Sequence, residues 1–113
     1  GYRLTELEIA PREVPDKLAA KADFDLIDCR KQDEWDLTHI DGATLLPLQQ
    51  LAARFEQELA GKEGREIVVY CKMGGRSMQF VQMLKQAGFT NVRSMAGGIL
   101  LWNTDINPAG PKY

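Results

Sequence analysis

The chain has 113 residues, of which 44% are hydrophobic and 27% are charged, so it suits one globular domain with its own core. Its net charge is −2, and its 14 basic and 16 acidic residues are interspersed, which argues against nucleic-acid or membrane-surface binding. No apolar stretch approaches the roughly 20 residues of a membrane span, and no signal-peptide pattern is present. We expect one cytoplasmic domain over residues 1–113, and a start at Gly1 fits a domain cut from a longer protein.

Short apolar stretches alternate with helical patterns along the chain. The first half predicts an extended lead-in over 2–9, a short helix opened by Pro11 or Pro15, a strand over 24–27, a short helix in 31–36 and a strand over 43–46. The second half predicts a helix with Leu51, Phe55 and Leu59 on one face, a strand over 67–70, a helix from Arg76 to Gly88, a strand over 91–95 and a helix over 99–106. This alternation predicts an α/β fold, a three-layer sandwich with a central, mostly parallel sheet flanked by helices.

The segment Tyr70 to Ser77 carries the chemistry that we expect. An apolar strand ends at Cys71, and a helix begins after Gly74 and Gly75, at the sheet edge where parallel folds bind ligands. Two glycines allow positive φ angles, so the backbone N–H groups of the loop can converge on an anion. Positive charge and a helix N-terminus both lower a thiol pKa from its usual value of about 8.5. We therefore expect Cys71 to be a nucleophilic thiolate, held in an anion-binding loop made of Lys72, Met73, Gly74, Gly75, Arg76 and Ser77.

Other polar and sulfur-containing residues are better explained by packing. Cys29 has no glycine loop after it, and core packing or support of the site is favoured over catalysis. Asp28 and Arg30 can pair with each other or with loop groups, and we expect both to act as scaffold near the site. His39 is expected to be a hydrogen-bonded structural residue, because a thiolate stabilised by backbone N–H groups needs no general base. Trp35 and Trp102 are expected to pack in the core or at its rim.

Candidate metal ligands are few. The chain holds two cysteines and one histidine, at spacings that match no zinc motif and include no C-x-x-C pair. Both cysteines lie near strand ends, so the fold can bring them close, but a cytoplasmic setting does not favour a disulfide. We therefore expect no metal site, and because no glycine-rich nucleotide loop is present, no bound cofactor.

Four stretches in order resemble the rhodanese-like sulfurtransferase domains. They are Asp28-Cys29-Arg30, Glu34-Trp35 leading to 39–43, the loop Cys71 to Ser77, and Met95-Ala96-Gly97-Gly98 with Trp102. The resemblance implies that Cys71 accepts a sulfane sulfur, holds it as a persulfide and passes it to a nucleophilic acceptor. Two positions depart from the family pattern: Thr38 stands where glycine is common, and Cys29 stands where an apolar β-former is usual.

Within that family, the chain is most similar to the C-terminal domain of the adenylyltransferase and sulfurtransferase proteins of molybdopterin and thiamine biosynthesis. The segments 66–71, 87–92 and 97–113 carry this likeness. It implies a sulfur donor such as thiosulfate or a cysteine desulfurase persulfide. It also implies a ubiquitin-like sulfur-carrier protein as the partner, whose C-terminus becomes a thiocarboxylate.

Two other functions stay open. A cysteine phosphatase can share this fold, but such phosphatases have five residues between cysteine and arginine, whereas four residues separate Cys71 from Arg76 here. The shorter loop suits sulfur better than phosphate. A non-catalytic binding module of the same fold typically loses the cysteine or the glycine loop, and both are present in this chain.

Overall fold

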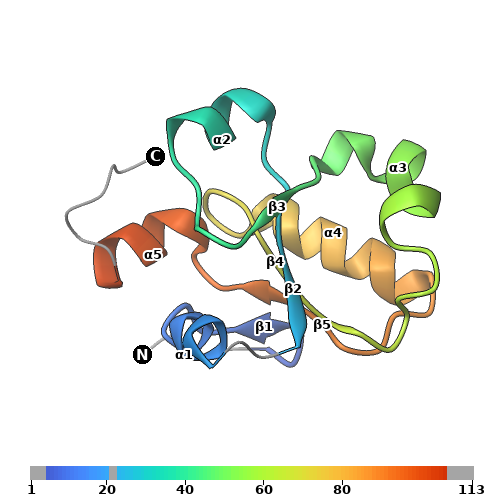
Figure 1. The fold of residues 1–113 in the computed structure, drawn as a ribbon, viewed down its shortest axis with the longest axis horizontal. Helices are drawn as coiled ribbons and strands as arrows, with labels where there is room; N and C mark the ends of the chain where they lie inside the picture. The colour runs from blue at the N-terminus through green and yellow to red at the C-terminus, as the bar shows by residue number, and fades with distance from the viewer. Residues whose placement is uncertain (1–4, 21–22, 107–113) are drawn as a thin grey trace.

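A five-stranded parallel sheet forms the centre of the protein (Figure 1). The computed structural model describes residues 5–20 and 23–106. The strands are β1 (Glu8–Ile9), β2 (Phe24–Asp28), β3 (Thr44–Leu45), β4 (Glu66–Tyr70) and β5 (Val92–Met95). Their spatial order is β1-β5-β4-β2-β3, and every pairing is parallel. The most apolar strand, β4, therefore lies in the middle, where both of its faces are covered.

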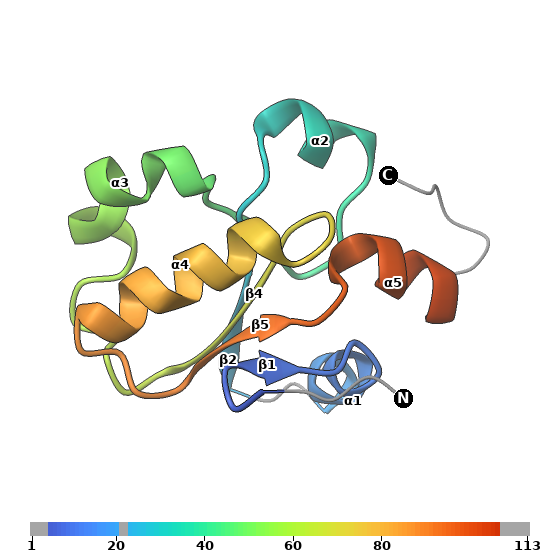
Figure 2. The ribbon, with the colours of Figure 1, turned by 180° about the vertical axis from the view of Figure 1, so that it is seen from behind.

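The helices form a layer on each face of this sheet. They are α1 (Glu13–Ala19), α2 (Gln32–Leu37), α3 (Leu51–Glu58), α4 (Gly75–Gln86) and α5 (Gly98–Asp105). Figures 1 and 2 show α3 and α4 on one face, α1 and α5 on the other, and α2 outside both layers. The predicted three-layer α/β sandwich is confirmed.

Side chains of β4 alternate between the two faces of the sheet, and the core accordingly consists of two clusters. Ile67 and Val69 pack in one cluster with residues of α3 and α4, whereas Val68 and Tyr70 pack in the other with residues of α1 and α5. Successive side chains of a strand point to opposite faces. Cys71, two residues beyond Val69, accordingly belongs to the cluster beneath α3 and α4.

The ends of several elements differ from the sequence prediction. The strand expected over 43–46 is only Thr44–Leu45. Leu46 and Leu48 still donate to the Asp28 and Cys29 carbonyls, and Pro47 between them has no N–H group to donate. The expected lead-in contributes only Glu8–Ile9 as strand, preceded by a turn, and its residues 2–4 lie outside the described residues. The remaining strands and helices lie within a few residues of their predicted positions.

A buried ion pair fixes the end of β2. Arg30 and Asp28 are both fully buried, with Nε 3.0 Å from Oδ1 and Nη2 2.7 Å from Oδ2. The same Nη2 donates to the Thr38 carbonyl at 2.6 Å. The Tyr70 hydroxyl accepts the Ile40 N–H at 3.0 Å, so β2 and β4 both hold the segment that follows α2. The scaffold role expected of Asp28 and Arg30 rests on this network.

We predict that Arg30→Met lowers the free energy of unfolding by about 3–5 kcal/mol, since it leaves the Asp28 carboxylate buried without a partner. Urea denaturation would measure the change. Arg54→Met is the matched control, because Arg54 pairs with Glu58 on α3 and both side chains are about one-third exposed. A loss of only about 0.3–0.5 kcal/mol is expected there. Equal losses in the two variants would contradict the prediction.

Candidate active site

The loop between β4 and α4 wraps around the Cys71 sulfur. Cys71 follows β4 directly and is 1% exposed, and Gly74 is the N-cap of α4. Figure 2 shows the loop between the first turns of α4 and α5, with α2 on its outer side. The sulfur therefore lies at the carboxyl end of the central strand, where the sequence analysis placed the site.

Backbone and hydroxyl groups of the loop contact this sulfur. The N–H of Gly74 donates to Sγ at 3.0 Å and the N–H of Ser77 at 3.4 Å, and the Ser77 hydroxyl lies 3.4 Å from Sγ. Gly74 has a φ of +112°, which an L side chain rarely adopts. Gly75 was expected to share that freedom, but its φ is not positive and a Cβ there would meet nothing within 4 Å.

The second cysteine lies beside the first. Cys29 follows β2, its N–H donates to the Tyr70 carbonyl at 3.0 Å, and its side chain is fully buried in the same cluster as Cys71. Each thiol also shifts the pKa of the other. The packing and support role favoured for Cys29 therefore places it in the same buried cluster as Cys71, as the position of both cysteines near strand ends allowed.

The pKa values of the two thiols are shifted in opposite directions, so that one is ionised and the other keeps its proton. Hydrogen bonds from Cys29, from the Ser77 side chain and backbone and from the Gly74 N–H lower the pKa of Cys71 to about 4, although burial acts in the opposite direction. The bond to Cys71, burial and the negative charge of Cys71 raise the pKa of Cys29 far above its usual range. At neutral pH, Cys71 is therefore the thiolate and Cys29 the S–H donor.

A second hydroxyl supports Ser77. Ser94 on β5 is 1% exposed, and its Oγ lies 2.7 Å from the Ser77 Oγ. The Ser77 hydroxyl also donates to the Gly74 carbonyl at 3.2 Å. Because a hydroxyl has one proton and two lone pairs, Ser77 accepts from Ser94 while its own proton serves either Gly74 or the sulfur.

The arginine of the loop is bound to a partner from α2. Arg76 donates Nη1 to Glu34 Oε1 at 2.7 Å and Nη2 to Oε2 at 2.9 Å, in a two-pronged ion pair. Hydrogen bonds from Arg76, together with the Lys31 N–H, lower the pKa of Glu34 to about 2. Positive charge from the loop was expected to lower the thiol pKa. The charge of Arg76 does interact with that of Cys71, whereas Lys72 is exposed and the groups that donate hydrogen bonds to the sulfur are neutral.

The start of α5 closes the other side of the loop. Ile99 N–H donates to the Cys71 carbonyl at 2.8 Å, and Leu100 N–H donates to the Lys72 carbonyl at 3.1 Å. Gly98 allows this approach, because a Cβ at that position would lie 2.5 Å from the Cys71 carbonyl oxygen. The pair Gly97-Gly98, named above for the family resemblance, therefore lies against the loop that holds the sulfur.

The histidine and the tryptophans have structural contacts, as the sequence analysis expected. His39 Nδ1 lies 3.0 Å from the Trp35 carbonyl, and the two rings stack with centroids 3.7 Å apart. Trp102 is partly buried against the cluster beneath α1 and α5. Met73, in contrast, is 70% exposed at the outer side of the loop.

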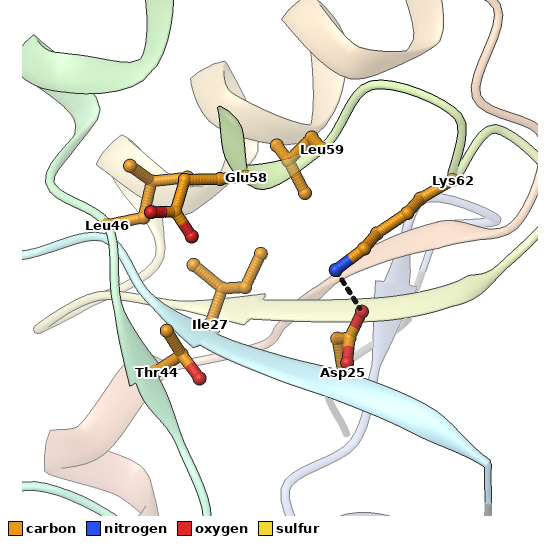
Figure 3. Close-up of a pocket in the computed structure, with 7 residues that line it drawn as sticks. All are labelled: Asp25, Ile27, Thr44, Leu46, Glu58, Leu59 and Lys62. Atoms are coloured by element: carbon orange, nitrogen blue, oxygen red, sulfur yellow. Dashed lines mark ion pairs between the residues drawn. The ribbon is translucent and has the colours of Figure 1, made fainter. Parts of the chain in front are cut away.

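One surface pocket lies away from the sulfur (Figure 3). It is lined by Asp25, Ile27, Thr44, Leu46, Glu58, Leu59 and Lys62. The Lys62 ammonium and the Asp25 carboxylate stand 3.8 Å apart across it, and Arg65 also binds Asp25 at 2.7 Å. These charges are satisfied by one another, and none of the lining residues is a predicted site residue.

Across residues 5–20 and 23–106, no helix has the length and apolar character that crossing a membrane requires. Over the same described part of the chain, no three or more His, Cys, Asp or Glu side chains gather in a way that would hold a metal ion.

We predict that Cys71 loses its proton as the pH rises through about 4, whereas an ordinary thiol does so near pH 8.5. Ultraviolet absorbance of the thiolate, read as the difference between the wild type and Cys71→Ser, would follow this titration. Cys29→Ala removes the strongest donor and should move the midpoint upward, while Cys29→Ser keeps a donor and should move it less. A midpoint near that of a free thiol in the wild type would contradict the assignment.

Comparison with known proteins places this geometry in a family. The family model described as rhodanese-like domain matches residues 10–105. The probable adenylyltransferase/sulfurtransferase MoeZ of Mycobacterium tuberculosis is 39% identical over 105 residues, which cover 93% of this chain and 26% of that protein. The adenylyltransferase and sulfurtransferase MOCS3-1 of Zea mays is 33% identical over 93 residues, which cover 78% of this chain and 20% of that protein. The chain thus spans about a quarter or less of these relatives.

Solved structures with a similar fold also include sulfurtransferases and rhodanese-like domains. The human single-domain sulfurtransferase TSTD1 has a TM-score of 0.79 at 26% identity, covering 89% of this chain and 98% of that one. The rhodanese-like domain of the Anabaena protein Alr3790 has a TM-score of 0.78 at 27% identity, covering 95% of this chain and 78% of that one. With the family match over residues 10–105, these likenesses identify the chain as a member of the rhodanese-like domain family.

Proposed function

We propose that this chain is a single sulfurtransferase domain in which Cys71 accepts a sulfane sulfur as a persulfide and passes it to an acceptor. The observation that carries the proposal is the buried Cys71 sulfur, which accepts hydrogen bonds from the Gly74 and Ser77 N–H groups and whose pKa lies well below that of a free thiol. A thiolate is the nucleophilic form of cysteine, and a low pKa also makes it a good leaving group. Both properties are needed, because Cys71 must take up sulfur and then release it.

The first half-reaction suits this environment. With thiosulfate as donor, the Cys71 thiolate attacks the sulfane sulfur, a new S–S bond forms, and sulfite leaves with the electron pair of the broken S–S bond. With the persulfide of a cysteine desulfurase as donor, a cysteine thiolate leaves instead. In either case the negative charge moves to the outer sulfur, and the loop from Lys72 to Ser77 surrounds it with N–H donors and positive charge.

The residues around the loop have supporting roles in this proposal. The pair of Arg76 with Glu34 fixes the first turn of α4, which carries the Ser77 donors. The Asp28–Arg30 pair fixes the strand ends beneath the sulfur. Lys72 and Met73 are exposed on the loop, where a donor or acceptor arrives first. Four residues between Cys71 and Arg76 make a ring suited to sulfur rather than to the phosphate of the phosphatase alternative.

We further propose that the acceptor is the activated C-terminus of a ubiquitin-like sulfur carrier in molybdopterin or thiamine biosynthesis. The support is the similarity to MoeZ and MOCS3-1, whose names combine adenylyltransferase with sulfurtransferase. This chain covers only the part of them that would supply sulfur. The carrier would then receive that sulfur as a thiocarboxylate.

We predict that thiosulfate, mixed with the protein and quenched at once, releases one equivalent of sulfite and adds the mass of one sulfur atom. Cys71→Ser should do neither, and it should form no thiocyanate from thiosulfate and cyanide. Met83→Leu, a change on the exposed side of α4, serves as the control and should behave as the wild type. Intact-mass spectrometry and a thiocyanate assay are the measurements.

Two results would overturn this proposal. One is the same added sulfur on the Cys71→Ser variant, which would place the persulfide elsewhere. The other is Cys71-dependent turnover of nitrophenyl phosphate without sulfite release from thiosulfate, which would favour the phosphatase. A protein that shows neither activity although its thiolate titrates would fit the binding module.

A further inference from the structure

Cys29 and Cys71 occupy neighbouring positions on adjacent strands. In the pairing of β2 with β4, Asp28 lies opposite Tyr70. The next pair of residues along these two strands is therefore Cys29 and Cys71. The Cys29 N–H still donates to the Tyr70 carbonyl, which extends the pairing to that point. Both side chains belong to the cluster beneath α3 and α4, two residue pairs beyond Ile27 and Val69.

This placement fits the geometry that a disulfide requires. Adjacent strands lie about 4.7–4.9 Å apart. A disulfide joins residues whose Cα atoms are about 4.4–6.8 Å apart. The two side chains are buried in the same cluster, and both are free cysteines. Bond formation therefore needs rotation of side chains and no separation of the strands.

The sulfur of Cys71 also has different neighbours on two sides. Cys29 approaches it from β2 and the sheet, whereas Gly74 and Ser77 approach it from the loop. A persulfide on Cys71 carries its outer sulfur toward the loop donors. Attack on a disulfide sulfur proceeds in line with the bond that breaks, so the sheet side is the side from which a thiol must come.

We propose that Cys29 is a resolving thiol, which attacks Sγ of a Cys71 persulfide and expels the outer sulfur as hydrosulfide. This inference rests on the proposed persulfide chemistry. An S–S bond forms between Cys29 and Cys71, and the S–S bond of the persulfide breaks. Cys29 loses its proton to solvent as it attacks. The electron pair of the broken bond leaves with the outer sulfur, which takes up a proton from solvent and departs as hydrosulfide. The sulfane sulfur is reduced to sulfide, and Cys29 is oxidised to the disulfide level, so no external oxidant is needed.

The resolving reaction would give the domain a second activity. When an acceptor is present, the persulfide sulfur is transferred and Cys71 returns as a thiolate. When no acceptor arrives, Cys29 discharges the sulfur as hydrosulfide and leaves the site as a disulfide, which a thiol or phosphine reductant reopens. The ligand class of this activity is any sulfane sulfur that Cys71 accepts, and the product is inorganic sulfide.

The test follows the protein over time without oxygen and without acceptor. The reduced wild type is loaded with thiosulfate, freed of excess donor, and sampled for intact mass and hydrosulfide. We expect the added sulfur to disappear, the mass to fall two hydrogens below that of the reduced protein, and one equivalent of hydrosulfide to appear. Trypsin should then yield the peptide 22–30 joined to the peptide 66–72, because these hold the two cysteines of the chain.

Two variants separate the resolving role from the donor role. Cys29→Ser keeps a hydroxyl donor beside Cys71 but cannot form the disulfide, and Cys29→Ala removes both functions. Loading is expected to be slower in both variants, because each alters a group that stabilises the Cys71 thiolate, but the sulfur that is added should then stay on the protein. If either variant is poorly folded, the other and the crosslinked peptide of the wild type still decide the question.

The outcomes separate this inference from the proposed function. Sulfite release followed by a persulfide as stable in the wild type as in Cys29→Ser overturns the resolving role alone. A disulfide between two molecules, visible as a doubled mass, overturns it as well. Absence of sulfite release in every variant overturns the proposed function, and the resolving role with it.

Discussion

The negative charge on the Cys71 sulfur is the constraint on which most of the local structure depends. A thiolate that is 1% exposed is stable only if protein groups replace the water that it has lost. Three elements provide those groups: the end of β2 through Cys29, the first turn of α4 through Ser77, and the loop itself through Gly74. The site is therefore assembled by the packing of a sheet and a helix rather than by one segment.

The charged side chains near the site form ion pairs with one another and do not bind the sulfur directly. Arg76 is held by Glu34, and Arg30 is held by Asp28, so both guanidinium groups have carboxylate partners. Pairing of this kind fixes elements: Arg76 joins α4 to α2, and Arg30 joins β2 to Thr38. Neutral groups donate hydrogen bonds to the thiolate, and the ions around it are paired with one another. The negative charge of the thiolate is therefore stabilised mainly by its immediate neighbours. The electrostatic field at the sulfur then depends on donor-to-sulfur distances of about 3 Å, as from the Gly74 N–H to Sγ. The packing of the surrounding elements fixes these distances.

Local pattern was sufficient to predict the elements and the position of Cys71. Strand 67–70 and the helix after the glycines follow from residue type and spacing, and a cysteine between them follows directly. The partners of the site depend instead on pairings between distant segments. Glu34 lies 42 residues from Arg76 and Ser94 lies 17 residues from Ser77, and nothing in the local pattern couples them. The contact of Cys29 with Cys71 required the strand register, since one residue of slip would turn Cys29 to the opposite face.

Hydrogen bonds to its carbonyls hold the loop backbone around the Cys71 sulfur. The carbonyls of Cys71 and Lys72 are bound by α5, and the Gly74 carbonyl is bound by Ser77 and by Met78 N–H at 3.1 Å. The backbone around the sulfur is thus fastened on both sides, while the Met73 side chain projects freely. A thioether is flexible and polarizable. The exposed Met73 side chain can therefore change its conformation while the backbone that holds the thiolate stays in place.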